Sequence, residues 1–204
     1  MFCSDFDAFC AALQKRGYIV HTAGGGGQAK AIALDLIGAG SVGCGGSMSA
    51  VEIGLLDALR AQGNVLYDHQ NTPRPERPAV FKGAAASDWY LCSTNAITRD
   101  CKLVNLDSTG NRVSGMFFGP KRVLLVIGKN KFVETLDAAE QRIHEVAAPL
   151  NAKRLGRNTP CVQTGKCADC YSPERICRVM SVISMPPGGL EAMHLLLVDE
   201  ALGY

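Results

Sequence analysis

The stretch "SVGCGGSMSAVEIGLLDALRAQGNVLYDH", residues 41–69, decides the fold. It begins as a short strand that enters a glycine-rich turn, and residues 50–63 then follow a helical pattern that ends at Gly63. A second strand, "NVLYDH", comes directly after the helix. Strand, helix and strand at such short intervals predict parallel strands joined by a right-handed crossover.

The same alternation continues on both sides of this stretch. Helices are expected at residues 4–17 (with Ser4 as a cap), 28–38, 79–87 and 133–155, the last with Leu136, Ala139, Ile143, Val146 and Leu150 inward and a kink or end at Pro149. Strands are expected at residues 18–23, 88–94, 122–128, 178–184 and 193–200, with a hairpin over 96–107. We therefore predict an α/β protein: one domain over residues 1–204, with a single open, mostly parallel sheet and helices on both faces.

Composition excludes several classes of protein. Hydrophobic residues make up 47% and charged residues 20%, which argues against general disorder, and a net charge of +2 gives no pull toward nucleic acid. No apolar run is long enough to span a bilayer, and the first residues are acidic where a signal peptide would be basic. We expect a cytoplasmic protein, in which the nine cysteines are more useful as thiols or metal ligands than as disulfides.

The glycine-rich turn is the first candidate site. Backbone amides between a strand and a helix suit phosphate or carboxylate, so we predict anion binding by Gly45, Gly46, Ser47, Met48 and Ser49. The turn lacks the lysine of a P-loop and the spacing of a dinucleotide fingerprint. Glu52, one turn further on, is the candidate acid, base or nucleophile. The alternative is a plain turn with a serine cap, in which Glu52 only complements the helix dipole.

A second candidate site is formed by two polar clusters, "STNAIT" at 93–98 and "DSTGNR" at 107–112. Both follow apolar strands, where an open α/β sheet collects its ligands. We predict that Thr94, Asn95, Thr98 and Asn111 bind a small anion, and that Arg112 grips it as a bidentate, catalytic partner. Ordinary turn chemistry is the alternative explanation of both clusters.

The segment "TPCVQTGKCADCYSPERIC", within a cysteine-rich loop at residues 159–178, holds the third candidate. Cys161, Cys167, Cys170 and Cys177 include one two-residue gap that lets two sulfurs face one metal. A compact run on one loop favours an iron-sulfur cluster over zinc, and redox-active thiols are a further alternative. Cys44 is expected to have a lowered pKa at a helix start, and Cys3, Cys10, Cys92 and Cys101 to be buried or incidental. The four histidines show no ligand spacing and are expected to be surface or core residues and not catalysts.

Five strings together are similar to a known family: "GGSMSAVEIGLLDAL", "STNAIT", "LVNLDSTGNRVSGMFFGPKRVLLVIGKN", "AAPLNAKRLG" and the cysteine segment. They resemble the LUD-domain family of bacterial and archaeal lactate-utilisation proteins, in the subgroup with a C-terminal cysteine segment. The resemblance implies the fold of ribose-phosphate isomerase, glucosamine-phosphate deaminase and the CoA transferases, in which the glycine-rich turn holds phosphate or CoA. The chain departs from the family pattern at Cys101, where glycine is usual, and at Cys44.

The resemblance also implies a role in cytoplasmic oxidation of lactate, alongside iron-sulfur partner proteins. Our leading interpretation is a 4Fe-4S protein with a small-anion cleft and a redox role. One alternative is a sugar-phosphate isomerase or CoA transferase with structural zinc, in which Glu52 or Asp107 moves a proton or attacks substrate. Another is an accessory subunit without turnover. The sequence leaves open whether the chain is an enzyme and which substrate it uses. A homo-oligomer is one possible assembly.

Overall fold

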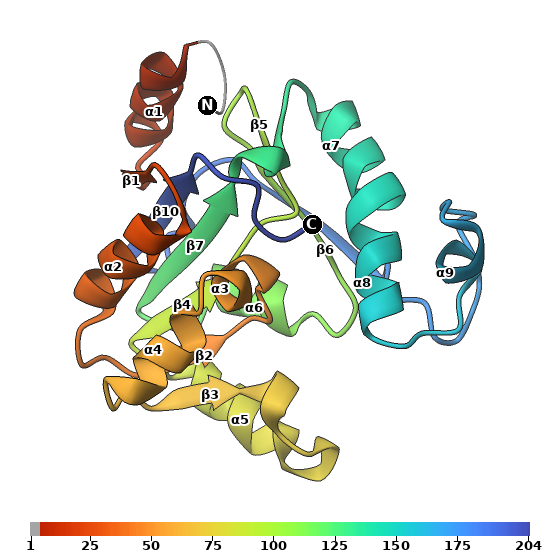
Figure 1. Cartoon of the computed structure of the whole chain (residues 1–204), viewed down its shortest axis with the longest axis horizontal. Coiled ribbons are helices and arrows are strands. Elements are labelled where there is room, and N and C mark those ends of the chain that lie inside the picture. The colour runs from red at the N-terminus through yellow and green to blue at the C-terminus, as the bar shows by residue number, and fades with distance from the viewer. Residues whose placement is uncertain (1–4) are drawn as a thin grey trace.

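The computed structural model describes residues 5–204, so the predicted cap Ser4 and the remark on Cys3 lie outside the described part. Its centre is a six-stranded, fully parallel sheet (Figure 1). In spatial order the strands are β1 (Ile19–Ala23), β10 (Ala192–Val198), β7 (Arg122–Gly128), β4 (Trp89–Cys92), β2 (Val42–Cys44) and β3 (Leu66–Asp68). The predicted open parallel sheet is confirmed.

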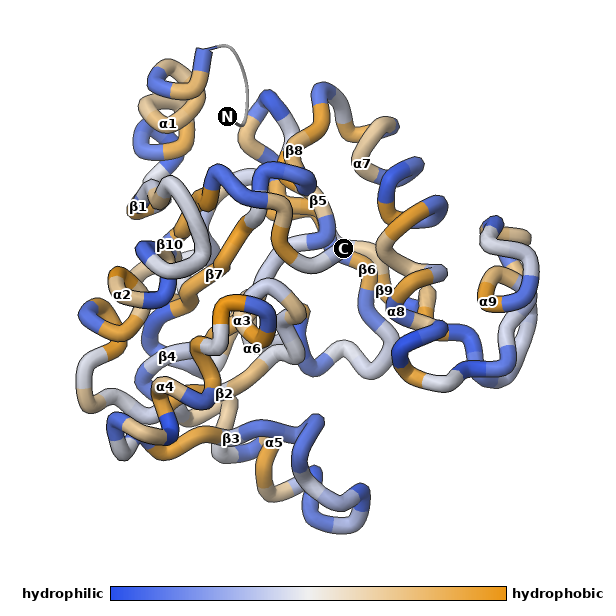
Figure 2. The backbone as a smooth tube through the Cα atoms, viewed as in Figure 1, coloured by the Kyte–Doolittle hydropathy of each residue, from blue (hydrophilic) through white to orange (hydrophobic). Residues whose placement is uncertain are grey.

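Strand β7 shows why the sheet is covered on both faces. Val123, Leu125 and Ile127 point into one core, whereas Leu124 and Val126 point into the other. Each buried aliphatic side chain of this kind contributes about 1.5–3 kcal/mol relative to exposure. Figure 2 shows the contrast between β7, coloured as hydrophobic, and the mostly hydrophilic loop that joins α8 to α9.

Helices of both faces supply the rest of the two cores. One face is covered by α2 (Gly26–Ile37), α3 (Met48–Glu52) and α4 (Leu55–Ala61). The other face is covered by α1 (Phe6–Lys15), α5 (Arg77–Ala85), α6 (Asn111–Phe117) and part of a second sheet. Within the described residues, no helix has the length and apolar character needed to cross a membrane.

The second sheet is an addition to the predicted architecture. Its four strands are, in spatial order, β8 (Phe132–Val133), β5 (Ala96–Thr98), β6 (Leu103–Asp107) and β9 (Val179–Ile183). Strands β5 and β6 form the predicted antiparallel hairpin. Its turn places Cys101 at a φ of 65°, a left-handed conformation that favours glycine, which accounts for the glycine expected there.

Two helical predictions need correction. The helix predicted over residues 50–63 is divided into α3 and α4 by Gly54, whose φ of 66° breaks the helical path. The polar cluster at 107–112, for which turn chemistry was the alternative explanation, continues into α6 at Asn111, a helix that the sequence analysis did not predict. Short 3₁₀ turns complete the connections: η1 (His69–Asn71), η2 (Arg74–Glu76) and η3 (Lys129–Lys131).

The long helical segment predicted over residues 133–155 consists of α7 (Leu136–Arg142), a π-helical turn (Ile143–Ala147) and α8 (Ala148–Arg154). Ala139 and Ile143 are buried as predicted, whereas Leu136, Val146 and Leu150 are 37%, 40% and 45% exposed. A π turn holds an extra residue and shifts the phase of the helix. The buried residues beyond it are therefore Ala147, Ala148, Pro149 and Ala152.

Candidate functional site

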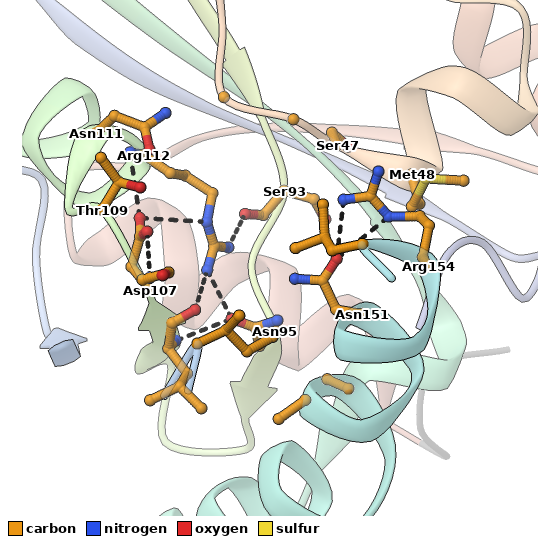
Figure 3. Close-up of a pocket in the computed structure, with 18 of the residues that line it drawn as sticks. Ser47, Met48, Ser93, Asn95, Asp107, Thr109, Asn111, Arg112, Asn151 and Arg154 are labelled. Carbon is orange, nitrogen blue, oxygen red and sulfur yellow. Dashed lines mark hydrogen bonds and ion pairs between the residues drawn. The ribbon is translucent and has the colours of Figure 1, made fainter. Parts of the chain in front are cut away.

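A cavity of about 210 Å³ opens at the carboxyl ends of the parallel strands β2, β4 and β7. The turn after β2 supplies Gly45–Met48, and the residues after β4 supply Ser93, Thr94 and Asn95. The opposite wall comes from the end of β6 and from α8 (Figure 3). This is the edge at which open α/β sheets bind ligands.

The lining of the cavity is strongly basic. Its titratable residues other than Tyr204 are Arg77, Arg112, Arg154, Arg157, Lys131, His69 and Asp107. Among the described lining residues, Asp107 is the one acid. Such an excess of positive charge in a concave site attracts anions.

The structure brings together most of the predicted anion-binding residues. Those that line the cavity are Gly45, Gly46, Ser47, Met48, Thr94, Asn95, Asn111 and Arg112. Ser49, Thr98 and Glu52 do not line it, which corrects their predicted position. Ser49 lies behind the wall and donates to Leu202 O at 3.1 Å, and Thr98 donates to Asp100 inside the hairpin. Glu52 is exposed and accepts from the Gly203 amide at 2.6 Å.

The glycine-rich turn needs its glycines for steric reasons. A Cβ on Gly45 would lie 2.8 Å from the Cβ of Cys92, and Gly46 has a φ of 79°. Ser47 caps α3, since its side chain accepts from the Ala50 amide at 3.2 Å. The turn is therefore both a serine-capped helix start and a wall of the cavity.

Arg112 is held by the protein itself. Its NH1 donates to Ser93 O at 3.0 Å and to Asn105 Oδ1 at 3.1 Å. Its NH2 donates to Asn95 Oδ1 at 2.7 Å and to Leu106 O at 2.8 Å. Both terminal nitrogens are engaged, so the guanidinium fork predicted to grip a ligand instead ties β4 to β6 and shapes the cavity.

Asp107 has a structural environment as well. Its carboxylate accepts from four backbone amides, those of Ser108, Gly110, Arg112 and Val113, at 2.6–3.2 Å. These contacts satisfy amides at the start of α6. Of the two described acids that were candidates for proton transfer, Glu52 lies outside the lining and Asp107 has its carboxylate occupied by backbone amides.

Two arginines near the end of α8 were missed by the sequence predictions. Arg154 donates to Asn151 Oδ1 through Nε at 3.2 Å and NH2 at 2.8 Å (Figure 3). Arg157 has a buried Nε without a hydrogen-bond partner. A buried donor without an acceptor is costly, and an anion in the cavity is the natural acceptor. No local sequence pattern links these two arginines to the turn at 45–48, because residues that line the same cavity are here more than a hundred positions apart in the sequence.

Lys131 is the second feature that the sequence predictions missed. It is 3% exposed, and its Nζ donates to Ser93 Oγ at 2.8 Å and to Ser49 Oγ at 2.9 Å. Burial, followed by the nearby charges of Arg142 and Arg112, lowers the pKa of the Lys131 amine to about 7. The available signal was its place directly after the buried strand β7, at the ligand-binding edge of the sheet.

The four predicted metal-ligating cysteines surround a second, smaller cavity. Its lining includes Cys161, Cys167, Cys170, Cys177 and His144. Cys161 belongs to α9 (Pro160–Thr164), and the other three lie in the irregular loop that follows. In the described residues, no three cysteine, histidine or acidic side chains are already arranged to hold a single metal ion.

Arg175 and the backbone organise this cysteine-lined cavity. Arg175 donates to Cys177 O and Cys170 O, both at 2.7 Å, and pairs with Asp169 at 2.8 Å. The Asp169 amide donates to Cys167 Sγ at 3.5 Å, and His144 Nδ1 lies 3.4 Å from that sulfur. The Arg175 guanidinium thus links the backbone at Cys170 to the backbone at Cys177.

The expectation for Cys44 was wrong. Cys44 ends β2 and is 3% exposed, and the helix begins only after Ser47. Burial, and then the charge of Asp68, raise the pKa of the Cys44 thiol to about 12. This thiol is a core residue and not an activated nucleophile.

A parallel sheet with a basic cavity at its carboxyl edge and a cysteine-lined cavity beside it defines an α/β protein with two candidate ligand sites. The family model of the LUD domain matches residues 6–198, so the chain belongs to the LUD-domain family. The crystal structure of a DUF162 family protein from Deinococcus radiodurans is similar, with a TM-score of 0.57 and 9% identity, over 95% of this chain and 96% of that one. At this identity the likeness shows the fold alone. No curated protein matches the sequence.

Proposed function

We propose that this LUD-domain protein binds a small carboxylate or phosphate in the basic cavity and carries a 4Fe-4S cluster on its four-cysteine segment. In this role it takes part in the cytoplasmic oxidation of lactate or a related 2-hydroxy acid, with iron-sulfur partner proteins. The observation that carries the proposal is the adjacency of the two cavities, which share Ala148 as a lining residue. Ile176 lines the basic cavity and its neighbour Cys177 the other.

Anion binding is supported by the charge of the lining and by the unsatisfied Nε of Arg157. Arg154 and Arg77 add guanidinium groups from two other elements, which would hold a carboxylate from several sides. A cavity of about 210 Å³ limits the bound portion to a small molecule. The alternative, a sugar-phosphate isomerase or CoA transferase that uses Glu52 or Asp107, has less support, because Glu52 does not line the cavity and Asp107 accepts from four backbone amides.

The donor set of the cysteine segment supports an iron-sulfur cluster. Four thiols line one small cavity, and the Asp169 amide already directs a hydrogen bond to the Cys167 sulfur. Four cysteine thiolates are the standard ligand set of a 4Fe-4S cluster, and amide hydrogen bonds to sulfur tune its potential. Zinc on the same thiolates is the alternative. When bound, a cluster would supply one-electron transfer, and partner iron-sulfur proteins would complete the two-electron oxidation.

Two measurements test the two halves of this proposal. Protein purified without oxygen is analysed for iron, sulfide and zinc and by visible absorption. Equal amounts of iron and sulfide with a broad charge-transfer band support the cluster, and colourless protein with one zinc per chain overturns it. Calorimetric titration with lactate, pyruvate and phosphate tests the cavity. Arg157→Met should weaken binding about tenfold or more, whereas Arg178→Met, outside the basic cavity, should not.

A further inference from the structure

The hydrogen bonds of Lys131 match the two hydrogens of an uncharged amine. The hydroxyl hydrogen of Ser49 is used on Leu202 O, and that of Ser93 on Val126 O at 2.6 Å. Both hydroxyl oxygens therefore act as acceptors toward Nζ. An uncharged amine has two hydrogens, which these two oxygens satisfy, and it keeps one lone pair without a partner.

The surroundings of Lys131 disfavour a charged amine. Among residues 5–204, no carboxylate lies within ion-pair distance of its Nζ. Glu52, the acid nearest to it electrostatically, uses one carboxylate oxygen on the Gly203 amide. The cations of Arg142 and Arg112 lie close by. A buried ammonium without a counterion, beside two guanidinium groups, is strongly unfavourable.

Lys131 also lines the same cavity as the arginines that favour an anion. A ligand held there by its carboxylate would place the adjacent carbon inside the cavity, where an uncharged amine can reach a carbonyl group. Buried, deprotonated lysines are the amines that form Schiff bases with carbonyl compounds. A small 2-oxo carboxylate matches both the arginines, through its carboxylate, and the Lys131 amine, through its carbonyl group.

We propose that Lys131 captures the carbonyl carbon of a small 2-oxo carboxylate as an imine inside the basic cavity. This inference rests on the proposed function, because the same cavity must hold the carboxylate. The lone pair of Nζ forms the C–N bond, and the carbonyl oxygen takes up protons and leaves as water. The amine loses both hydrogens in the overall step, no oxidant is needed, and hydrolysis reverses it.

Reductive trapping tests this step directly. The full-length protein is incubated with pyruvate and sodium cyanoborohydride, and the modified lysine is identified by peptide mass spectrometry. We expect one reduced pyruvate adduct per chain, on Lys131, with a trapping rate that rises with a midpoint near pH 7, the pKa of this amine. Lys131→Met should abolish the adduct. Lys129→Met is the matched control, because Lys129 lies in the same 3₁₀ turn but pairs with Asp199 at 3.2 Å.

Calorimetry separates the failure of this inference from failure of the proposed function. Pyruvate binding without an adduct, or labelling spread over surface lysines at equal rates, overturns the role of Lys131 and leaves the anion site intact. If lactate, pyruvate and phosphate do not bind and no adduct forms, both the proposed anion site and the role of Lys131 are overturned. Lys129→Met, a variant of a residue outside the cavity lining, should bind lactate within about threefold of the unchanged protein and still form the adduct on Lys131.

Discussion

The two cavities of this protein are built in opposite ways. The basic cavity is formed by the ends of buried parallel strands, and its polar side chains are fixed by hydrogen bonds within the protein. The sulfurs of the cysteine-lined cavity come from a surface loop with one five-residue helix, in which Tyr171 is 98% exposed, while His144, Ala148 and Pro149 supply another part of its lining. The core thus pre-organises the first site, whereas the sulfurs of the second are carried by a surface loop outside the hydrophobic cores.

This contrast predicts a large difference between two arginines. Arg112→Met should destabilise the protein by about 3–5 kcal/mol, because it leaves buried carbonyl acceptors and Asp107 without their partner. Chemical denaturation at pH 7 measures the loss. The matched change, Arg175→Met, should cost less than about 1 kcal/mol, since its contacts lie within the surface loop. Equal losses for both variants would contradict the contrast.

Substitution of the buried Lys131 should have the second largest effect on the free energy of unfolding, and it should stabilise the protein. The unfolded chain keeps the Lys131 ammonium up to about pH 10.5, while the folded chain loses the proton above about pH 7. The unfolded state therefore binds the extra proton between these values, so the stability of the unchanged protein rises by up to about 1.4 kcal/mol per pH unit.

Lys131→Met removes the free-energy cost of burying an amine that is protonated in the unfolded chain. The variant should be more stable than the unchanged protein by roughly 2–4 kcal/mol at pH 7, and the gap should shrink toward pH 10. Urea denaturation of both proteins at several pH values measures the difference, in which other titrating groups cancel. A gap that is constant with pH would mean that the folded protein keeps Lys131 charged.

The elements of the basic cavity follow the rules on which the sequence prediction relied. Apolar runs such as "RVLLVIG" mark buried parallel strands, and the turn after β2 therefore lies at the edge where ligands bind. Local patterns could not place Arg154 or Arg157, whose approach to the turn depends on the packing of α8 across the cavity. They also did not place Glu52, because its carboxylate accepts from the amide of Gly203, a residue far away in the sequence.

The second half of the chain was harder to predict for a related reason. The π turn at Ile143–Ala147 changes which side of the helix is buried, and no residue pattern in this segment announces it. His144 belongs to this π turn, and its Nδ1 lies 3.4 Å from the Sγ of Cys167. The four cysteines were recognised by spacing alone, and their convergence on one cavity agrees with that spacing. The group that they bind stays a prediction.

A smaller effect is expected when the caps of two short helices are compared. Ser47 accepts from the Ala50 amide at the start of α3, whereas Thr159 makes no such bond at the start of α9. Ser47→Ala should cost about 1 kcal/mol and Thr159→Ala less than about 0.5 kcal/mol, both measured by denaturation of metal-free protein. A larger loss at Thr159 would show that the cysteine loop is coupled to the core.

The cysteines themselves should also have little effect on global stability. Replacing all four predicted ligand cysteines with serine, in metal-free protein, should change the free energy of unfolding by less than about 1 kcal/mol, because Cys161, Cys167, Cys170 and Cys177 lie outside the hydrophobic cores. Hydrogen exchange gives the complementary measurement. Loading the unchanged protein with iron and sulfide should slow amide exchange within residues 159–178, while exchange in β4 and β7 stays the same. Slowed exchange across both regions would mean that the cluster stabilises the sheet as well, and that the two cavities form one cooperative unit.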